Sequence, residues 1–203
     1  MSAKKPSAEK PSAEKDGRRR DAAATRAAIL ESARAAFIAS GYEGAGVREI
    51  AEGAGVTAML INRYFGSKEG LFAEVLSTAN RRPIIATPET LAAPDRAARI
   101  SKALLKVTES EATALDGFLI MLRSISNERA VEIARAVVES HHQKNVTKAL
   151  SGPDAAERAA LLMSLVAGVQ IMRQVVGLDA LSKDRDAALE RVLGDLVARL
   201  VDE

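Results

Sequence analysis

Three consecutive polar side chains interrupt one short apolar segment of this 203-residue chain. Within AMLINRYFGSKEG, residues 58–70, Asn62, Arg63 and Tyr64 stand side by side before a Gly-Ser pair closes the run. Core helices rarely carry an amide, a guanidinium and a phenol in a row. The amide can pair with the edge of adenine and the guanidinium with the edge of guanine, each through two hydrogen bonds. The stretch therefore predicts a surface that reads DNA.

Two short helices joined by a glycine turn are expected to position these side chains. The spacing of apolar residues predicts one helix over 47–54 and a second that Thr57 caps and that runs through Phe65. Gly55 lies in the turn between them, where the backbone needs a positive φ. This is the spacing of a helix-turn-helix, whose second helix enters the major groove. Its outward face carries Thr57, Ala58, Asn62, Arg63 and, near its end, Tyr64.

Basic residues outside this helix complete the predicted DNA contacts. Lys68 begins the next helix, where its ammonium and the free backbone N–H groups both favour a phosphate. Residues 1–20 carry seven Lys or Arg against three acids, whereas residues 21–80 carry five against seven and residues 81–203 carry 17 of each. All surplus positive charge thus lies in the first 20 residues. The predicted DNA-binding residues are Arg48, Thr57, Ala58, Asn62, Arg63, Tyr64, Lys68, Arg18, Arg19 and Arg20.

Helical periodicity continues along the rest of the chain, so we expect an all-α fold. A first helix begins near Asp21 and stops at Gly41, and Pro83, Pro88 and Pro94 mark a boundary that no helix interior tolerates cheaply. No segment shows sustained period-2 alternation. Further helices are expected at roughly 95–108, 111–126, 128–150, 153–176 and 184–201. The predicted organisation is a disordered basic arm over 1–20, a helix-turn-helix domain over 21–80 and a larger helical domain over 81–203.

Residues 25–76 resemble the DNA-binding domain of the tetracycline-repressor (TetR) family. The matching residues are Ile29-Leu30, Phe37, Gly41-Tyr42, Val47, Ile50-Ala51, Ala54-Gly55-Val56, Tyr64-Phe65 and Ser67-Lys68-Glu69. The resemblance implies a homodimeric, ligand-responsive transcriptional regulator, usually a repressor, bound to a double-stranded DNA operator.

The chain departs from the family pattern at three places. Ala45-Gly46 stand where a Thr-Ser or Thr-Thr pair is common, so the usual hydroxyl at the start of the helix is missing. Met59-Leu60 replace a frequent Gly-Thr pair. Asn62 replaces a tyrosine that typically touches phosphate, which shifts this position toward base reading or a weaker phosphate bond.

The C-terminal region offers an apolar lining for a ligand. Phe118 is its one aromatic residue, so an aromatic cage for a cation is disfavoured. A small apolar or acyl-type ligand, with a polar end near Gln170 or Arg173, fits better, although core packing explains the same residues equally well. The predicted ligand-binding residues are Phe118, Met121, Leu122, Ile125, Met163, Val166, Gln170 and Arg173.

The last two helices are the expected dimer interface. Leucines at 4-3-4 spacing form a narrow seam suited to helix–helix contact, and the resemblance implies a four-helix bundle between subunits. The alternative is that both helices close their own domain. The predicted interface residues are Leu162, Val169, Leu189, Leu193, Leu196 and Leu200.

Other function classes find little support. The absence of cysteine excludes thiol catalysis and disulfides. Adjacent histidines, His141 and His142, point about 100° apart on a helix, and Glu109, Glu111 and Asp116 have no nucleophile or phosphate loop beside them. We expect no catalytic residue, metal or cofactor.

With no apolar leader and no run of about 18 apolar residues, we expect a cytoplasmic protein without a membrane partner. A constitutive or partner-controlled DNA binder, or a helical lipid-carrier or enzyme bundle, are the alternatives.

Overall fold

The computed structural model describes residues 12–79, 85–109 and 116–202, with the side chains of residues 12–19, 141 and 142 left out. Within these residues there is no β-strand, and the expected all-α fold is confirmed. The first four helices are α1 (Ser12–Gly44), α2 (Val47–Gly53), α3 (Ala58–Phe65) and α4 (Lys68–Ala79). The later α-helices are α5 (Pro88–Ala92), α6 (Arg96–Glu109), α7 (Asp116–Arg123), α8 (Glu128–Val138), α9 (Lys144–Ala149), α10 (Ala155–Gln170) and α11 (Asp186–Val201).

Two π-helical segments extend the later helices. The segment η1 (Glu139–Gln143) joins α8 to α9, and η2 (Ile171–Val176) continues α10 until Gly177, whose φ of 73° ends the helix. Two short 3₁₀ turns, Asp179–Leu181 and Lys183–Arg185, lead into α11. The expected helices over 128–150, 153–176 and 184–201 are therefore present, but periodicity alone gave no sign of the π-helical segments.

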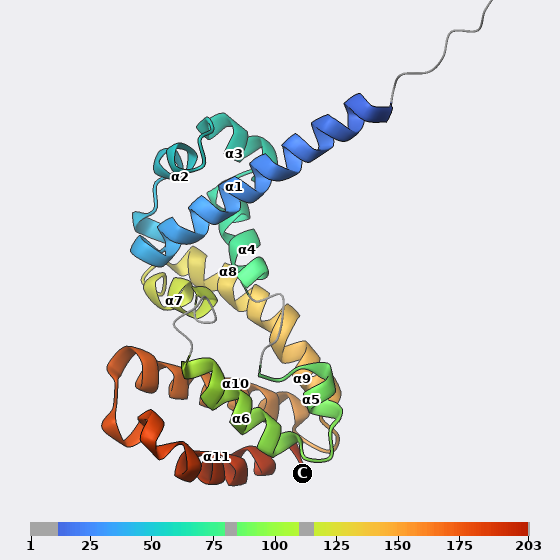
Figure 1. The fold of residues 1–203 in the computed structure, drawn as a ribbon, viewed down its shortest axis with the longest axis vertical. Helices are drawn as coiled ribbons and strands as arrows, with labels where there is room; N and C mark the ends of the chain where they lie inside the picture. The colour runs from blue at the N-terminus through green and yellow to red at the C-terminus, as the bar shows by residue number, and fades with distance from the viewer. Residues whose placement is uncertain (1–11, 80–84, 110–115, 203) are drawn as a thin grey trace, which may run out of the picture.

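The first helix begins earlier than expected. It starts at Ser12, so the prediction of disorder is wrong for residues 12–20, while residues 1–11 lie outside the described part of the chain. The segment contains alanine, glutamate, lysine and three arginines, all strong helix formers, and these continue the helical pattern that follows Asp21. Figure 1 shows the start of α1 projecting past α3.

A short helix also forms in the proline-rich stretch that was expected to be a boundary. Pro88 occupies the first turn of α5, where its missing N–H breaks no helical hydrogen bond. Thr87 caps this helix, because its hydroxyl accepts a hydrogen bond from the Thr90 N–H at 3.1 Å. The prolines therefore shape a turn and a single short helix.

Gly41 gives α1 its sharp bend. Its φ of 67° and ψ of −173° break the helical geometry, which confirms the predicted stop there. An added Cβ would lie 2.3 Å from the carbonyl oxygen of Arg123, so the end of α7 packs directly against the glycine backbone. The next residue, Tyr42, turns into the core, and its N–H donates to the Ser124 hydroxyl at 2.9 Å.

The N-terminal core joins helices from both sides of the predicted domain boundary. Phe72 meets Phe37 and Tyr42 edge-on, with ring centroids 5.0 Å and 4.9 Å apart. Ile120 of α7 is fully buried in this same core. The core comprises Ile29, Ala33, Ala36, Phe37, Tyr42, Ala45, Ile50, Ala51, Ile61, Leu71, Phe72, Val75, Leu76, Ile120, Ala130 and Val137. Helix α7 thus packs with the N-terminal helices, although it follows residue 81 in the sequence (Figure 1).

The remaining helices form a separate C-terminal core. Helices α6, α10 and α11 lie together at the other end of the molecule (Figure 1), and α11 packs along α6. Buried Arg158 of α10 links this helix to α11 and to the loop before α10. Its guanidinium donates hydrogen bonds to the carbonyl oxygens of Leu200, Ser151 and Pro153. The C-terminal core comprises Leu91, Ile100, Val146, Leu150, Ala159, Leu162, Val197 and Val201, beside a smaller cluster of Leu104, Leu105 and Leu193.

We predict that Gly41→Ala lowers the free energy of unfolding by more than about 3 kcal/mol. The backbone region costs about 1–3 kcal/mol for a residue with a side chain, and the added methyl group must also displace the carbonyl group of Arg123. Gly55→Ala is the control, because its φ of 66° is also positive but an added Cβ meets no atom within 4 Å. Urea unfolding followed by circular dichroism measures both. Equal losses would contradict the close packing at Gly41.

Candidate nucleic-acid interface

The turn between α2 and α3 is held by backbone hydrogen bonds. The Val56 N–H donates to the Ala51 carbonyl at 2.9 Å, and the Gly55 N–H donates to Glu52 at 3.0 Å. Gly55 has the positive φ that its place in the turn predicts. Ala51 is buried where the two helices meet, and Ile61 is fully buried beneath α3. The two helices are thus fixed to each other and to the N-terminal core.

The starts of both helices lack a hydroxyl cap. At α2, Gly46 is the N-cap residue, and the carboxylate of Glu49 instead accepts a hydrogen bond from its N–H at 3.4 Å. At α3, Thr57 occupies the predicted N-cap position, but its side chain makes no capping hydrogen bond. The exposed hydroxyl of Thr57 is therefore not used to hold the helix.

The outward side of α3 carries the side chains that the sequence singled out. Asn62 and Arg63 are exposed, whereas Ala58 and Tyr64 are half-buried and pack against the N-terminal core. Arg48 is exposed on α2. The structure thus brings an amide and a guanidinium together on a rigid helix, free to meet hydrogen-bonding edges of another molecule.

The aromatic end of α3 is anchored by α1 and α4. The guanidinium of Arg26 lies 5.1 Å from the centre of the Phe65 ring and pairs with the Glu74 carboxylate at 2.9 Å. The Tyr64 ring lies beside Phe65, with centroids 6.3 Å apart. This packing fixes the rotation of α3 about its axis, so Asn62 and Arg63 stay outward.

Lys68 is turned away from the outward side of α3. Its ammonium lies 4.7 Å from the centre of the Tyr42 ring and contacts the carbonyl oxygen of Glu43 at 3.5 Å. The start of α4 is also occupied by the chain's own groups, because the Ser67 hydroxyl accepts from the Gly70 N–H at 3.2 Å. A hydrogen bond from Ser67 and the backbone N–H hold the pKa of Glu69 below its usual value. A phosphate at this helix start would compete with that carboxylate.

The three arginines of the predicted arm belong to α1. Arg20 is exposed, and the side chains of Arg18 and Arg19 lie outside those described. Because α1 is helical from Ser12, these residues form part of a helix rather than a disordered arm.

The eight predicted ligand-binding residues divide between the two ends of the molecule. Helix α7 packs against α1, α4 and α8, whereas α10 packs against α6, α9 and α11. Met121 accordingly joins the N-terminal core, and Val166 packs beside the Leu104 cluster. Ile125 is 66% exposed, which removes it from a buried pocket. Phe118, Leu122 and Met163 are half-buried, and Gln170 is buried.

Arg173 is paired within its own subunit. Its side chain is only 6% exposed, and Nη1 lies 2.7 Å from Oδ1 of Asp186 at the start of α11. This ion pair with Arg173 lowers the pKa of Asp186 below its ordinary value, against the opposing effect of burial. Arg173 Nη1 and Asp186 Oδ1 face each other as charges without hydrogen-bond geometry, and the amide oxygen of Gln174 is likewise buried without a hydrogen-bond partner. The positive charge that was expected to meet a ligand is therefore already balanced.

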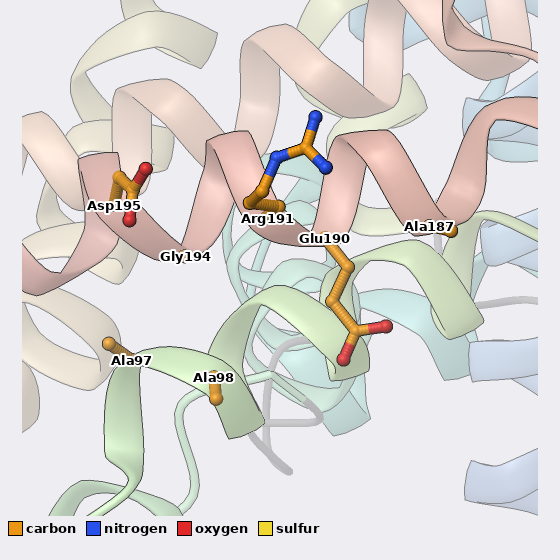
Figure 2. Close-up of a pocket in the computed structure, with 7 residues that line it drawn as sticks. All are labelled: Ala97, Ala98, Ala187, Glu190, Arg191, Gly194 and Asp195. Carbon is orange, nitrogen blue, oxygen red and sulfur yellow. The ribbon is translucent and has the colours of Figure 1, made fainter.

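A shallow groove of about 560 Å³ lies between α6 and α11 (Figure 2). Small side chains create it, and Glu190 extends toward α6, whereas Arg191 and Asp195 extend away. The lining residues are Ala97, Ala98, Ala187, Glu190, Arg191, Gly194 and Asp195. None of the predicted ligand-binding residues lines this groove.

The predicted dimer seam is largely used inside the subunit. Leu162 and Leu193 are buried against neighbouring helices of the same chain, so they offer almost no surface to a second subunit. The cause is that α11 turns this seam toward α6. Val169, Leu189 and Leu200 are half-buried and pack with the same clusters, and Leu196 is the one member that is exposed.

The apolar side chains that are exposed on the last helices lie, apart from Leu196, outside this seam. Leu161, Met172, Val175 and Val176 follow one side of α10 and η2 at spacings close to whole helical turns. Val192 and Leu196 lie one turn apart on α11. We call these six residues the apolar face. Their exposed fractions lie between 43% and 57%, so much of each side chain is left open by its own subunit.

No group of three or more potential metal ligands occurs among the residues that the structure describes. The side chains of His141 and His142 lie outside those residues.

Two family models match the chain. Residues 29–75 match the model of bacterial regulatory proteins of the tetR family. Residues 95–201 match a tetracyclin repressor-like C-terminal domain, and this second match alone covers more than half of the chain. No curated protein matches.

Several solved structures share the fold. A TetR-family regulator from Streptomyces coelicolor A3 is 24% identical, with a TM-score of 0.60 over 89% of this chain and 96% of that one. A putative TetR-family transcriptional regulator from Rhodococcus sp. is 18% identical, with a TM-score of 0.68 over 88% and 99%. NalD, the secondary repressor of the MexAB-OprM multidrug efflux pump in Pseudomonas aeruginosa, is 22% identical, with a TM-score of 0.63 over 89% and 97%.

We predict that Asp186→Ala lowers the free energy of unfolding by about 2 kcal/mol at pH 7, because it leaves the buried Arg173 cation without a partner. Asp195→Ala is the control, because Asp195 is exposed on the same helix. This variant should change the free energy of unfolding by less than about 0.5 kcal/mol.

The same variant carries a pH signature. Because the pKa of Asp186 is lower in the folded state, its contribution is complete above the unfolded value of about 4 and is lost as the pH falls through the folded value. The difference in the free energy of unfolding between wild type and Asp186→Ala, measured by urea unfolding, should therefore shrink below about pH 4. A gap that stays constant down to pH 2, or that grows, would contradict the ion pair.

Proposed function

Because the chain belongs to the TetR family of bacterial regulatory proteins, we propose that it is a ligand-responsive repressor that binds a palindromic operator as a homodimer. As a member of this family it is a DNA-binding transcription regulator and not an enzyme. Regulators of this family bind DNA and act as dimers. The operator, the ligand and the residues that contact them belong to the proposal, as does a cytoplasmic location.

The exposed pair on α3 is the observation that carries the proposal. Asn62 and Arg63 project from a helix whose opposite side is fixed by Ile61. In the major groove, arginine can bind guanine and asparagine can bind adenine, each through two hydrogen bonds. We assign base reading to these two residues, and contacts to nearby bases or phosphates to Arg48, Thr57, Ala58 and Tyr64.

Phosphate attraction needs a source outside the helix-turn-helix. Residues 21–80 carry five basic against seven acidic residues, so this segment alone does not attract DNA over distance. The surplus positive charge lies in residues 1–20. Arg18, Arg19 and Arg20 belong to α1, whose start projects past α3 (Figure 1). We assign these arginines to phosphates or to the minor groove, whose negative potential attracts arginine.

The apolar face supports a homodimer built from α10, η2 and α11. By length and a mean hydropathy of 1.6, Ala155–Val176 could cross a membrane, and only 17% of its apolar window is buried in the subunit. Yet this segment lies within the matched C-terminal domain of a family that acts as dimers. A second copy can cover the same apolar side chains and form a four-helix contact.

A ligand response is supported by the contacts of α7. The carboxylate of Asp116 pairs with Arg34 of α1, and at the other end Arg123 donates to the carbonyl of Ala39 at 2.5 Å. A small apolar or acyl-type ligand that displaced α7 would therefore move α1 and, with it, α3. NalD, which has the same fold, is a repressor of a multidrug efflux pump.

A second candidate is a constitutive or partner-controlled DNA binder. The internal pairing of Arg173 and the division of the predicted ligand residues between two cores favour it. Both candidates share the same DNA-reading surface.

We predict that Asn62→Ala and Arg63→Ala each weaken binding to DNA from the protein's own promoter region by about 1–3 kcal/mol. Both side chains are exposed, so the thermal midpoint of unfolding should hardly change. Competition between the promoter duplex and a scrambled duplex gives the specificity ratio. Arg99→Ala, an exposed arginine on α6, is the control. An unchanged ratio in both variants would remove α3 from base reading.

We predict that Val192→Asp and Leu196→Asp convert the dimer to a monomer, since each places a charge in the apolar face. Light scattering measures the mass in solution. Ala187→Asp introduces the same charge on α11 beside the shallow groove and should leave the mass unchanged. A dimeric mass for both variants would overturn this interface.

A further inference from the structure

Met59 is the most exposed large apolar side chain among the described residues. It is the second residue of α3, and 79% of its surface is accessible. Its neighbour Leu60 is half-buried, and Ile61 is fully buried. Most of the thioether side chain therefore remains open to solvent in the isolated subunit.

Met59 shares its side of α3 with the two proposed base-reading residues. Positions 59, 62 and 63 are separated by three and four residues, so their side chains are neighbours on one side of a helix. All three are exposed. A single exposed apolar side chain elsewhere would need no explanation. Here it stands beside an exposed amide and an exposed guanidinium on the same side of α3.

The major groove offers one apolar group, the 5-methyl group of thymine. Asn62 and Arg63 can satisfy donors and acceptors on base edges, but Met59 can form no strong hydrogen bond with them. A flexible, polarisable thioether does adapt its shape to a small apolar partner. The chemistry of the three side chains is thus complementary to a groove that presents both polar edges and methyl groups.

We propose that Met59 is a specificity-determining residue that reads thymine through its 5-methyl group. The inference rests on the proposed function, because it needs α3 to lie in the major groove. Residues 59 and 62 are about 4.5 Å apart along the helix axis, and base pairs are stacked about 3.4 Å apart. The thymine should therefore lie within about two base pairs of the bases that Asn62 and Arg63 contact.

The test begins with a DNA site chosen by the protein itself. Full-length dimer is incubated with a random double-stranded DNA library, bound duplexes are amplified over several rounds, and the enriched site is synthesised. Each thymine of the site is then replaced in turn by deoxyuridine, which keeps every hydrogen-bonding group and removes only the 5-methyl group. Fluorescence anisotropy measures the dissociation constant of each duplex.

One symmetric pair of replacements should weaken binding by the wild-type protein. Burial of one methyl group favours binding about fourfold, so replacement in both half-sites should weaken it about 15-fold. Met59→Ala should bind the thymine and deoxyuridine duplexes with equal affinity. Met59→Gln keeps the length of the side chain but replaces its apolar end with an amide, and it should also lose the preference for the methyl group.

Ile125→Ala serves as the matched control, because it truncates another highly exposed apolar side chain far from α3 in the sequence. It should retain the full thymine preference. All variants change exposed residues, and equal thermal midpoints of unfolding would establish that they are folded.

The outcomes separate this inference from the function on which it rests. If no sequence is enriched from the library, sequence-specific DNA binding is refuted, and the role of Met59 with it. If a site is enriched but deoxyuridine changes nothing, or if Met59→Ala keeps the wild-type preference for thymine, only the reading of thymine by Met59 is refuted. An enriched half-site that contains no thymine would also refute only the reading of thymine by Met59.

Discussion

The close contact between the bend of α1 and the end of α7 is the constraint on which the arrangement of this molecule depends. At Gly41 the backbone of one segment lies against the carbonyl of another, and a side chain would not fit. Around it, Ser124 accepts from the Tyr42 N–H, and Asn127 donates to the Glu43 carboxylate at 2.8 Å. Since Tyr42 also belongs to the N-terminal core, the position of α2 and α3 is fixed by residues that come much later in the chain.

Much of the fold could be predicted from the sequence, because it follows from local rules. The stop at Gly41, the turn at Gly55 and the outward position of Asn62 and Arg63 all follow from glycine geometry and helical periodicity. The helical start at Ser12 does not follow from periodicity, because a polar, charged segment lacks the apolar stripe that periodicity detects, although its alanine, glutamate, lysine and arginines favour a helix.

The errors in the candidate sites have one physical origin. Periodicity tells which residues share a side of a helix, but not which neighbour covers that side. Periodicity therefore predicts that the seam containing Leu193 contacts a second subunit, whereas α6 of the same chain packs against Leu193. The sequence likewise predicts that Arg173 binds a small ligand and that Lys68 binds a DNA phosphate. In the structure Asp186 lies beside Arg173, and the ring of Tyr42 lies beside Lys68. Such partners depend on tertiary packing and leave no local signal.

The helical start of α1 changes the thermodynamics of any contact that its arginines make. A flexible tail must lose backbone freedom when it binds, at a cost of about 1–2 kcal/mol for each residue that becomes fixed. Residues 12–20 continue α1 as a helix, so much of that entropy is already lost when the protein folds. The same rigidity ties the reach of Arg18, Arg19 and Arg20 to the orientation of α3. With the DNA contacts proposed for these arginines, sequence changes in this segment would alter both the length of DNA that one subunit covers and its affinity for DNA.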